Sequence, residues 1–274
     1  MDEPVATVVA LWRYPVKSMV GEQLDAAELT DRGLLGDRRH ALVDRETGKV
    51  ASAKFPRKWP TLFAHRATYV EPPTDGHNFP AVRITLPDGR DIRSDDADVH
   101  QVLSADLGRE VTLDQSVPEA PSLEEYWPDI EGLDHRDALT DETMAPGTFF
   151  DSGIVHLLTT ATLDRLGQLY PEGRFDVRRF RPNLVLAPAD GQAGFVEDAW
   201  VGQTLAIGDE VRLRINKPCL RCVMTTLEQD DLPRDPGILR AAAQHNDVRV
   251  GVYASVERGG QIRIGDEVWL SESR

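Results

Sequence analysis

The sequence predicts a mainly β protein with few helices, folded as a closed or half-closed barrel. Short apolar runs rich in β-branched residues recur along the chain, and turns containing Gly, Pro or Asp separate them. The pentapeptide Ile-Gly-Asp-Glu-Val occurs at 207–211 and again at 264–268, each time between two apolar runs. Because glycine tolerates positive φ, we expect both copies to form corners of a curved sheet.

The first part of the chain alternates strands with turns. Pro87-Asp88-Gly89 indicates a turn, since proline fixes φ and glycine accepts positive φ. In the stretch 95–107 the apolar residues fall on one face of a helix, which Gly108 ends. We expect strands at 6–12, 24–29 and 110–113, hairpins at 40–52 and 82–93, and a helix at 95–107.

A stretch rich in proline and acidic residues, 118–146, divides the sequence. Its composition predicts an acidic linker or surface loop. Beyond it we expect strands at 154–158, 183–187, 248–257 and 262–270, a hairpin at 204–215, and helices at 160–170 and 236–244. This organisation predicts an N-terminal β-rich (α+β) domain over 1–117 and a second domain over 147–274, with residues 1–40 as candidates for packing with the C-terminal half.

The composition limits the kinds of protein to which this chain can belong. With 274 residues, of which 41% are hydrophobic, the chain can bury a sizeable core. It has no apolar run of about 18 residues, so we expect no transmembrane helix and no membrane partner. Residues 1–4 lack the basic and apolar regions of a signal peptide, which predicts a cytoplasmic protein. The formal net charge of −15 disfavours binding to nucleic acid and to anionic lipid.

The chain contains two cysteines, Cys219 and Cys222, in one C-x-x-C motif. Two thiols form no disulfide framework, so the motif is a redox pair, half of a metal site, or one working thiolate beside an inert cysteine. Arg221 adjoins Cys222 and Lys217 is near it, and positive charge favours the thiolate form of a cysteine. We therefore expect Cys222 to be more reactive than a free thiol, whose pKa is about 8.5. The residues that follow, 223–226, indicate a strand, whereas a thioredoxin motif would begin a helix.

Three polar clusters, at 14–18, 36–39 and 178–183, interrupt the apolar strands and place lysine or arginine at strand ends. Arginine can bind phosphate through two parallel N–H groups, and lysine binds it as a point charge. Arg181 precedes a proline, so we expect it to be held extended beside the next strand. If these cations converge, an acidic chain can still bind an anionic cofactor.

Four ordered segments resemble the MOSC-domain proteins that carry an N-terminal MOSC β-barrel domain, a group that includes the mitochondrial amidoxime-reducing component and its bacterial relatives. They are Pro-Val-Lys-Ser at 15–18, Gly-Asp-Arg at 36–38, Phe-Arg-Pro-Asn at 180–183 and Pro-Cys-Leu-Arg-Cys-Val-Met-Thr-Thr at 218–226. The resemblance spans nearly the whole chain. It implies a MOSC-type β-barrel at 147–274 and a MOSC N-terminal β-barrel domain at 1–117.

The resemblance also implies a molybdenum-molybdopterin cofactor (Moco), with one cysteine thiolate as a ligand of the molybdenum. It places this role on Cys222 and leaves Cys219 without one. The family's cofactor-anchoring positions carry over to Lys17, Ser18, Arg38, Ser152, Arg181, Asn183 and Arg221. The family is also described as binding pyridoxal phosphate.

The activity that the resemblance implies is the reduction of small N-hydroxylated compounds of the amidoxime or hydroxylamine type. The sequence shows no N-terminal membrane anchor, and its two cysteines are too few for a [2Fe–2S] cluster held by four thiolates. Electrons would therefore come from a separate donor, ferredoxin-like or cytochrome b5-like with its reductase. MOSC domains also occur in molybdenum-cofactor sulfurases, so the alternative is a protein that binds the cofactor or carries sulfur without reducing a substrate. A third hypothesis is a barrel-based binding module with a structural cysteine pair.

Overall fold

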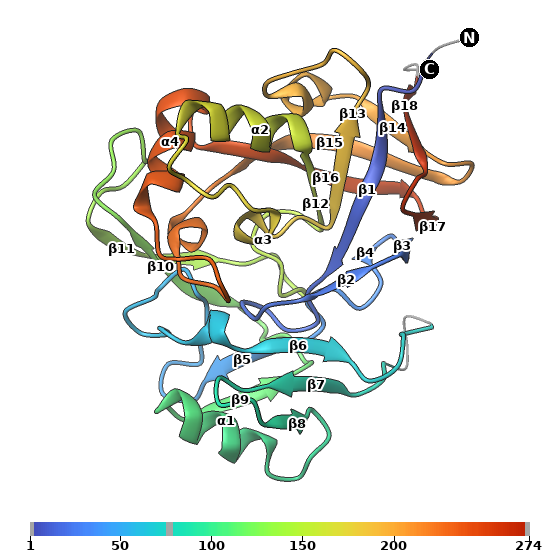
Figure 1. Ribbon diagram of the computed structural model, residues 1–274. Coiled ribbons are helices and arrows are strands. Elements are labelled where there is room, and N and C mark those ends of the chain that lie inside the picture. The colour runs from blue at the N-terminus through green and yellow to red at the C-terminus, as the bar shows by residue number, and fades with distance from the viewer. Residues whose placement is uncertain (1–2, 75–78, 272–274) are drawn as a thin grey trace.

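The computed structural model describes residues 3–74 and 79–271, and it confirms a mainly β fold with few helices. The strands are β1 (Ala6–Arg13), β2 (Glu22–Leu24), β3 (Ala26–Thr30), β4 (Gly33–Leu34), β5 (Ala41–Asp44), β6 (Arg66–Tyr69), β7 (Val82–Thr85), β8 (Asp91–Arg93), β9 (Val111–Asp114), β10 (Ser122–Trp127), β11 (Ala138–Thr143), β12 (Val155–Thr159), β13 (Leu184–Pro188), β14 (Thr204–Ile207), β15 (Val211–Leu220), β16 (Arg249–Arg258), β17 (Gly260–Arg263) and β18 (Glu267–Ser271). The helices are α1 (Val99–Leu107), α2 (Thr160–Leu169), α3 (Val177–Phe180) and α4 (Pro236–Asn246). Figure 1 shows an upper part built around a barrel and a lower part that carries α1.

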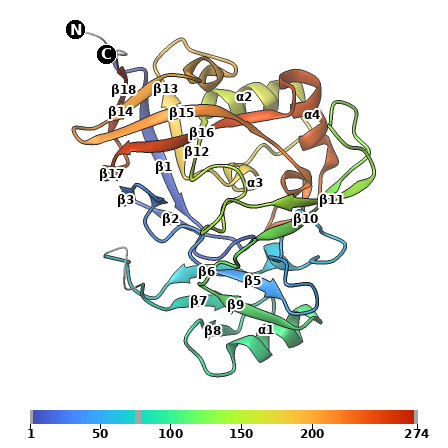
Figure 2. The ribbon, with the colours of Figure 1, turned by 180° about the vertical axis from the view of Figure 1, so that it is seen from behind.

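Seven strands close the barrel of the upper part. Their hydrogen-bonded order is β13-β12-β16-β15-β14-β18-β1, and β1 pairs back with β13. The β12–β13 pair is parallel, and the other six pairs are antiparallel. The barrel therefore takes one strand from the N-terminal region and six from the second half of the chain (Figures 1 and 2).

Apolar side chains from these strands fill the interior of the barrel. Val8 and Leu11 of β1 are fully buried, and a register shift between Val8 and Ala10 accommodates their odd spacing. Leu213 and Val252 are equally buried in the same core, on β15 and β16. Because side chains occupy the interior, a ligand must bind at an end or on the outside of the barrel.

The two copies of Ile-Gly-Asp-Glu-Val form neighbouring corners of this sheet, as predicted. Gly208 and Gly265 have positive φ values of 53° and 95°. Ile207 pairs with Val268 between β14 and β18, so the first copy lies beside the second. A side chain other than glycine would be strained at either corner.

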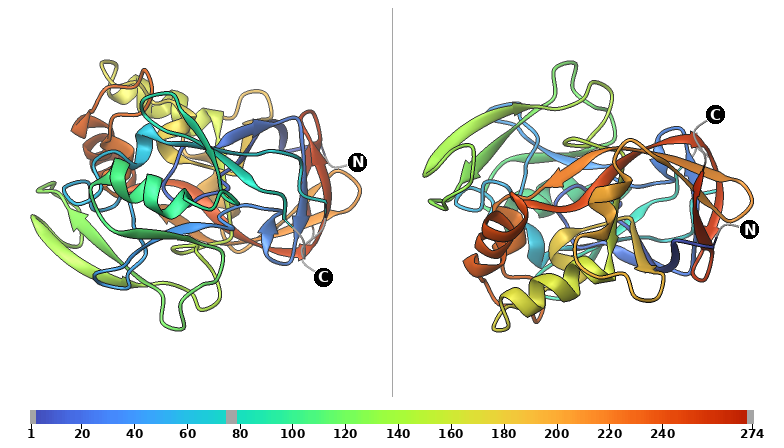
Figure 3. Two further views of the ribbon diagram at one scale, coloured as in Figure 1. Left: turned by 90° about the horizontal axis from the view of Figure 1, so that it is seen from below. Right: turned by 90° about the horizontal axis from the view of Figure 1, so that it is seen from above.

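Helices α2 and α4 contact each other and cover the outside of the barrel near β13 and β16 (Figure 3). Each begins with a side-chain cap: Thr159 accepts from the Thr162 N–H, and Asp235 accepts from the Gly237 N–H. Leu166 of α2 and Ile238 of α4 are buried in one apolar cluster. No helix in the described part of the chain is long and apolar enough to span a membrane.

The lower part has a core of its own. Strands β6, β7 and β8 form one antiparallel sheet, β5 pairs with β9, and α1 packs against β9. Trp59, Ile84 and Leu103 are buried here. Met224 and Leu227, which follow the C-x-x-C motif, pack against the same core. The cysteine segment therefore lies at the junction between the two parts.

The acidic segment contains a hairpin instead of the predicted linker or surface loop. Strands β10 and β11 pair along their whole length. Alternate residues of β10 face the rest of the molecule, and of these Leu123 and Glu125 are buried. The acidic composition therefore belongs to a paired hairpin, in which Glu125 is buried and Asp141 is exposed. The division into domains at 117 and 146 stays a prediction.

Two local predictions beside this junction are also wrong. Val223–Thr226, predicted as a strand, forms a 3-10 turn in which the Thr225 hydroxyl donates to the Cys222 carbonyl. Arg181, predicted to be extended, has a left-handed backbone with φ 56° and ψ 48° and ends α3, where its N–H donates to the Val177 carbonyl. The hydrogen bond that closes the helix outweighs the ordinary preference of a residue before proline.

Candidate functional site

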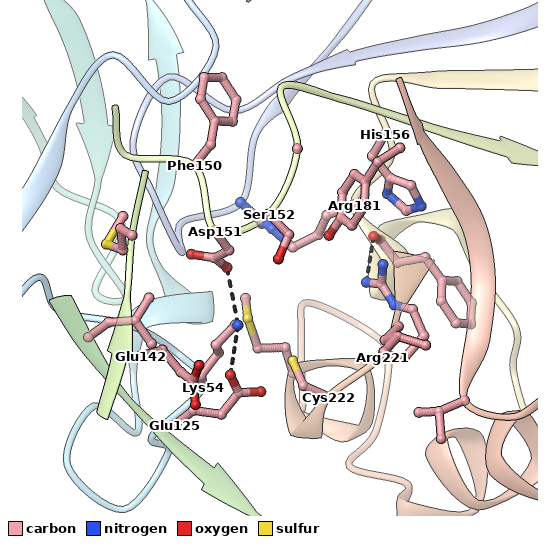
Figure 4. A pocket seen from close by; sticks show the side chains of 18 of the residues that line it. Lys54, Glu125, Glu142, Phe150, Asp151, Ser152, His156, Arg181, Arg221 and Cys222 are labelled. Carbon is pink, nitrogen blue, oxygen red and sulfur yellow. Dashed lines mark hydrogen bonds and ion pairs between the residues drawn. The ribbon is translucent and has the colours of Figure 1, made fainter. Parts of the chain in front are cut away.

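A cavity of about 580 Å³ lies between the strand ends of the upper part and the β10–β11 hairpin. The residues predicted for the site all line it: Lys17, Ser18, Arg38, Ser152, Arg181, Asn183, Arg221 and Cys222. Figure 4 shows Arg181, Arg221, Asp151 and Cys222 around this space. Their proximity is a finding of the structure, and their roles in binding stay predictions.

Arg181 is a buried cation in the wall of the cavity. Its Nη1 donates to the Met19 carbonyl at 2.7 Å, and its guanidinium carbon lies 4.1 Å from the centroid of the Tyr14 ring. Its Nη2 is buried and has no hydrogen-bond partner among the described residues. Burial lowers the pKa of Arg181 to about 10, so the side chain remains charged at neutral pH. Because an unmet buried donor costs free energy, an acceptor on a ligand would stabilise this side chain.

Arg221 provides a second donor of the same kind. Its Nη2 donates to the Phe180 carbonyl at 2.8 Å, and its Nη1 lies 2.6 Å from the sulfur of Cys219. Its Nε is buried without a partner in the part of the chain that the structure describes. Arg181 and Arg221 thus both line the cavity, and each has one buried N–H without a partner among the described residues, a donor set that suits the oxygens of a phosphate.

Asp37 organises the region around Arg38. Its carboxylate accepts from the Tyr14 N–H at 2.7 Å and from Asn183 Nδ2 at 3.0 Å, and it forms an ion pair with Arg38. Asn183 Oδ1 in turn accepts from the His156 N–H at 3.1 Å. Burial acts to lower the pKa of Arg38, but the charges of Asp37, Tyr14 and Asp151 together outweigh burial and the pKa is raised. Asn183 therefore bridges protein segments, besides lining the cavity.

A chain of ion pairs runs along the cavity (Figure 4). Lys17 donates to Asp151 and, at 3.0 Å, to the Phe149 carbonyl. Asp151 also lies 3.5 Å from Lys54 Nζ, which donates to Glu125 at 2.8 Å. The sequence analysis missed Lys54 and Glu125. Lys54 could have been considered because the chain contains few lysines. Glu125 could have been considered because one residue separates it from apolar Leu123, which places both on the same side of a strand.

Burial and charge set the protonation of these groups. Burial acts to raise the pKa of Asp151, but Lys17 and Lys54 outweigh it and hold the pKa well below its usual range. Burial acts to lower the pKa of Lys54, but Asp151, Cys222 and Glu125 raise it well above its ordinary value. For Lys17 burial dominates, and its pKa is lowered. Asp151 and Lys54 are therefore a carboxylate and an ammonium group over the physiological pH range.

Strained backbone is concentrated in the wall of the cavity. Ser18, Arg38 and Arg181 have positive φ values of 63°, 48° and 56°. Asp247 and Val248 also have positive φ, so five of the seven such non-glycine residues in the described chain line this cavity. Each left-handed residue costs on the order of 1 kcal/mol and persists only where its surroundings hold it, as at functional sites.

The two thiols differ from the prediction made from neighbouring charges. Burial and the carboxylate of Glu125 raise the pKa of Cys222 to about 11 in spite of the nearby cations. Burial also acts to raise the pKa of Cys219, but Arg221 and His156 outweigh it and lower the value to about 6. The prediction that neighbouring cations make Cys222 more reactive than a free thiol is therefore wrong for the protein without a bound cofactor. Arg221 adjoins Cys222 in sequence but contacts Cys219 in space.

The two predicted serines occupy different positions. Ser18 is buried, and its Oγ accepts from the Ala53 N–H at 3.1 Å, which leaves the hydroxyl hydrogen free to donate. Ser152 is exposed in the lining of the cavity. Gly153, which follows it, has no room for a side chain, because a Cβ there would lie 2.6 Å from the Tyr253 ring. This close contact fixes the path of the segment that carries Ser152.

Within residues 3–74 and 79–271, no group of three or more His, Cys, Asp or Glu side chains is arranged to hold a metal ion. A metal ligated by Cys222 would therefore take its other ligands from a bound group.

Comparisons with known proteins identify two family domains. The MOSC domain matches residues 146–269, and the MOSC N-terminal beta barrel domain matches residues 5–109. Mitochondrial amidoxime reducing component 2 of Rattus norvegicus is 25% identical over 292 residues, which cover 97% of this chain and 84% of that protein. Its namesake in Homo sapiens is 27% identical over 294 residues, with the same coverage of 97% and 84%.

A comparison with solved structures finds the YUAD protein from Bacillus subtilis, which has 14% sequence identity to this chain and a TM-score of 0.46. The match covers 96% of this chain and 94% of that one. The two family domains together cover most of the sequence, and the chain belongs to the MOSC-domain proteins that carry an N-terminal MOSC β-barrel domain.

Proposed function

We propose that this protein is a molybdenum-cofactor-dependent oxidoreductase that reduces small N-hydroxylated compounds of the amidoxime or hydroxylamine type. The observation that carries the proposal is one cavity that joins the thiol of Cys222 to two guanidinium groups, each with a buried N–H that lacks an acceptor. The relatives named amidoxime reducing components, which align with 97% of this chain, support the same reaction class.

The donors of the cavity fit the phosphate of a molybdopterin. Its oxygens would satisfy Arg181 Nη2 and Arg221 Nε, two N–H donors of the cavity lining that have no partner among the described residues. Lys17 and Arg38 add positive charge, and Ser18 can donate its hydroxyl hydrogen. Cys222 would be the protein's ligand to molybdenum. When bound, the cofactor supplies the two-electron redox chemistry.

The chain's own residues prepare the cavity for this reaction. Reduction of an N–OH group to N–H takes up two electrons and two protons and releases one water molecule. Lys54 keeps its proton at Nζ, so it offsets the carboxylates of Asp151 and Glu125 and would stabilise an ionised Cys222. Leu123, Trp127 and Met144 give the same cavity an apolar side that can contact the organic part of a substrate.

A separate protein would supply the electrons. The chain has two cysteines, and an iron–sulfur cluster held by protein thiolates needs four. We therefore propose a ferredoxin-like or a cytochrome b5-like donor with its reductase. Rates of substrate reduction with each donor in turn, compared with the rate with a chemical reductant, distinguish the two.

Metal analysis and a model amidoxime test the proposal. We expect about one molybdenum per chain in the purified protein, and reduction of the amidoxime to the amidine with a chemical electron donor. The Cys222→Ser variant should keep its circular dichroism spectrum and lose turnover. Reduction at the wild-type rate by that variant would show that the assignment of Cys222 is wrong. Molybdopterin without any N-reduction, or a persulfide on Cys222, would instead favour a cofactor-binding or sulfur-carrying protein.

A further inference from the structure

The proposed function leaves unused one reactive group that lies behind the wall of the cavity, next to the lining residues Arg221, His156 and Tyr253. Cys219 lies on β15 with no exposed surface, three residues before Cys222. Its sulfur is 2.6 Å from Arg221 Nη1, well inside the distance at which sulfur accepts a hydrogen bond. Contacts with the side chains of His156 and Tyr253 complete its polar surroundings.

A buried cysteine is ordinarily a small apolar side chain with an inert thiol. The surroundings of Cys219 do not fit that role, because they place a guanidinium group and two further polar side chains against the sulfur. A neutral thiol is a poor acceptor, and it would leave the buried charge of Arg221 without a counter-charge. A thiolate at Cys219 resolves both difficulties, and a pKa lowered to about 6 agrees with this state.

The contact with Cys219 also fixes the direction of Arg221. One end of the guanidinium group, Nη2, is held by the Phe180 carbonyl, and the other, Nη1, is held by the sulfur. The backbone N–H of Arg221 donates to the Val248 carbonyl at 2.9 Å. With these atoms held, Nε is the guanidinium nitrogen of this lining residue that has no partner in the part of the chain that the structure describes.

We propose that Cys219 is a positioning residue that acts as a thiolate counter-ion for Arg221 and directs Arg221 Nε toward the anionic group of the bound cofactor. This inference rests on the proposed function, since it assumes a phosphate-bearing cofactor in the cavity. It gives the two cysteines separate tasks: Cys222 ligates the metal, and Cys219 orients the cation that holds the cofactor. Partners that orient a ligating group typically change affinity by about 10- to 100-fold when they are removed.

A double-mutant cycle tests the proposal through cofactor binding. The variants are Cys219→Ala, Arg221→Met and the double variant, and Cys219→Ser is a size-matched control for the volume of the sulfur. Apoprotein is loaded with molybdopterin, and the concentration that gives half-maximal loading is measured. We expect this concentration to rise by about 10-fold in Cys219→Ala and in Cys219→Ser. The double variant should bind no more weakly than Arg221→Met, because Cys219 acts through Arg221. Additive losses, or unchanged loading in Cys219→Ala, would overturn the proposal.

A second measurement needs no cofactor. In a Cys222→Ala background Cys219 is the sole thiol, and its ionisation is followed by the ultraviolet absorbance of the thiolate. We expect a midpoint near pH 6 and a shift to above 8 when Arg221→Met is added. A midpoint at or above the ordinary thiol value with Arg221 intact would exclude the counter-ion role. If the wild-type protein binds no molybdopterin but this titration behaves as expected, then the proposed function fails and the pairing of Cys219 with Arg221 stands.

Discussion

Asn183 donates a hydrogen bond of 3.0 Å to the same Asp37 carboxylate that forms an ion pair with Arg38, and so joins segments 146 residues apart in sequence. Asp37 also accepts from the Tyr14 N–H. Tyr14 belongs to the polar cluster at 14–18, so a third segment shares the same carboxylate. The three polar clusters at 14–18, 36–39 and 178–183 thus meet at one buried side chain, which does not itself line the cavity.

Asp37→Asn should therefore destabilise the fold as well as the site. The substitution removes the charge that balances Arg38 and places an NH₂ group among donors. Breaking one side of a buried ion pair typically costs about 3–5 kcal/mol, and we expect a loss near the lower figure in the free energy of unfolding. Urea denaturation measures the loss. The exposed Asp25→Asn is the matched control and should leave the unfolding midpoint unchanged. A buried Asp37→Asn variant as stable as the control would contradict the role of this carboxylate.

The left-handed backbone of Ser18 leads us to expect that two variants at this position differ in stability. Ser18→Gly and Ser18→Ala both remove the hydroxyl, but only glycine adopts a φ of 63° without strain. We expect Ser18→Gly to be more stable than Ser18→Ala by about 1 kcal/mol in thermal or chemical denaturation. Both variants should lose the same share of cofactor affinity, because the loss comes from the hydroxyl. Equal stability of the two would show that the backbone here is not strained.

His40 predicts a pH dependence of stability. Burial, with the charge of Arg39 next to it, lowers its pKa from 6.5 to about 4. Between pH 6.5 and pH 4, His40 is therefore protonated in the unfolded chain but not in the folded chain. The free energy of unfolding therefore has its full value with respect to His40 above pH 6.5. It decreases by up to about 3 kcal/mol as the pH falls toward 4.

Replacement of His40 by Gln removes this titration. The free energy of unfolding of the wild type and of His40→Gln is compared at pH 7, 5.5 and 4.5, so that carboxylates common to both cancel. We expect the difference between the two proteins to shrink with acidification. A constant difference across this range would mean that His40 titrates normally in the fold.

Substitutions of the two charged residues near Cys222 should have opposite effects on the rate at which this cysteine is alkylated. Burial and Glu125 raise its pKa to about 11, whereas Lys54 acts in the other direction. In the apoprotein at neutral pH, Glu125→Gln should speed the reaction of Cys222 with iodoacetamide, and Lys54→Met should slow it. Mass spectrometry of the tryptic peptides gives the rate at each cysteine. Changes of the same sign in both variants would indicate altered access and not altered charge.

Much of the fold follows from the sequence, because its signals are local. The Ile-Gly-Asp-Glu-Val corners, the turn at Pro87-Asp88-Gly89 and the helix that Gly108 ends all depend on neighbouring residues, and each forms as predicted. The β10–β11 hairpin was missed because its stability comes from the burial of Leu123 and Glu125 against distant segments. Charge-rich composition cannot show that one face of a strand is covered.

The sequence identified several residues of the cavity but not the contacts that these residues make with one another. Motif resemblance named the eight residues that meet in its wall. It could not place Lys54, which no motif includes, or show that Arg221 turns toward Cys219 and away from Cys222. These relationships depend on which side of a strand or turn a side chain leaves, and Arg181 illustrates the point, since closure of α3 reversed its expected backbone.

The closed barrel has a consequence for the order in which its parts assemble. One of its seams joins β1 to β18 at the pair Ala6–Val268, so the barrel closes only when two strands distant along the chain meet. Pairings this distant along a chain form slowly. The loop after β1, which brings Lys17 and Ser18 to the cavity, is anchored in the lower core by Val16 and Met19. The wall of the cavity also includes Cys222, from the segment after β15, and Tyr253 of β16. The binding cavity is thus complete only after these late strands have formed, and a cofactor must enter a folded barrel and not the N-terminal part alone.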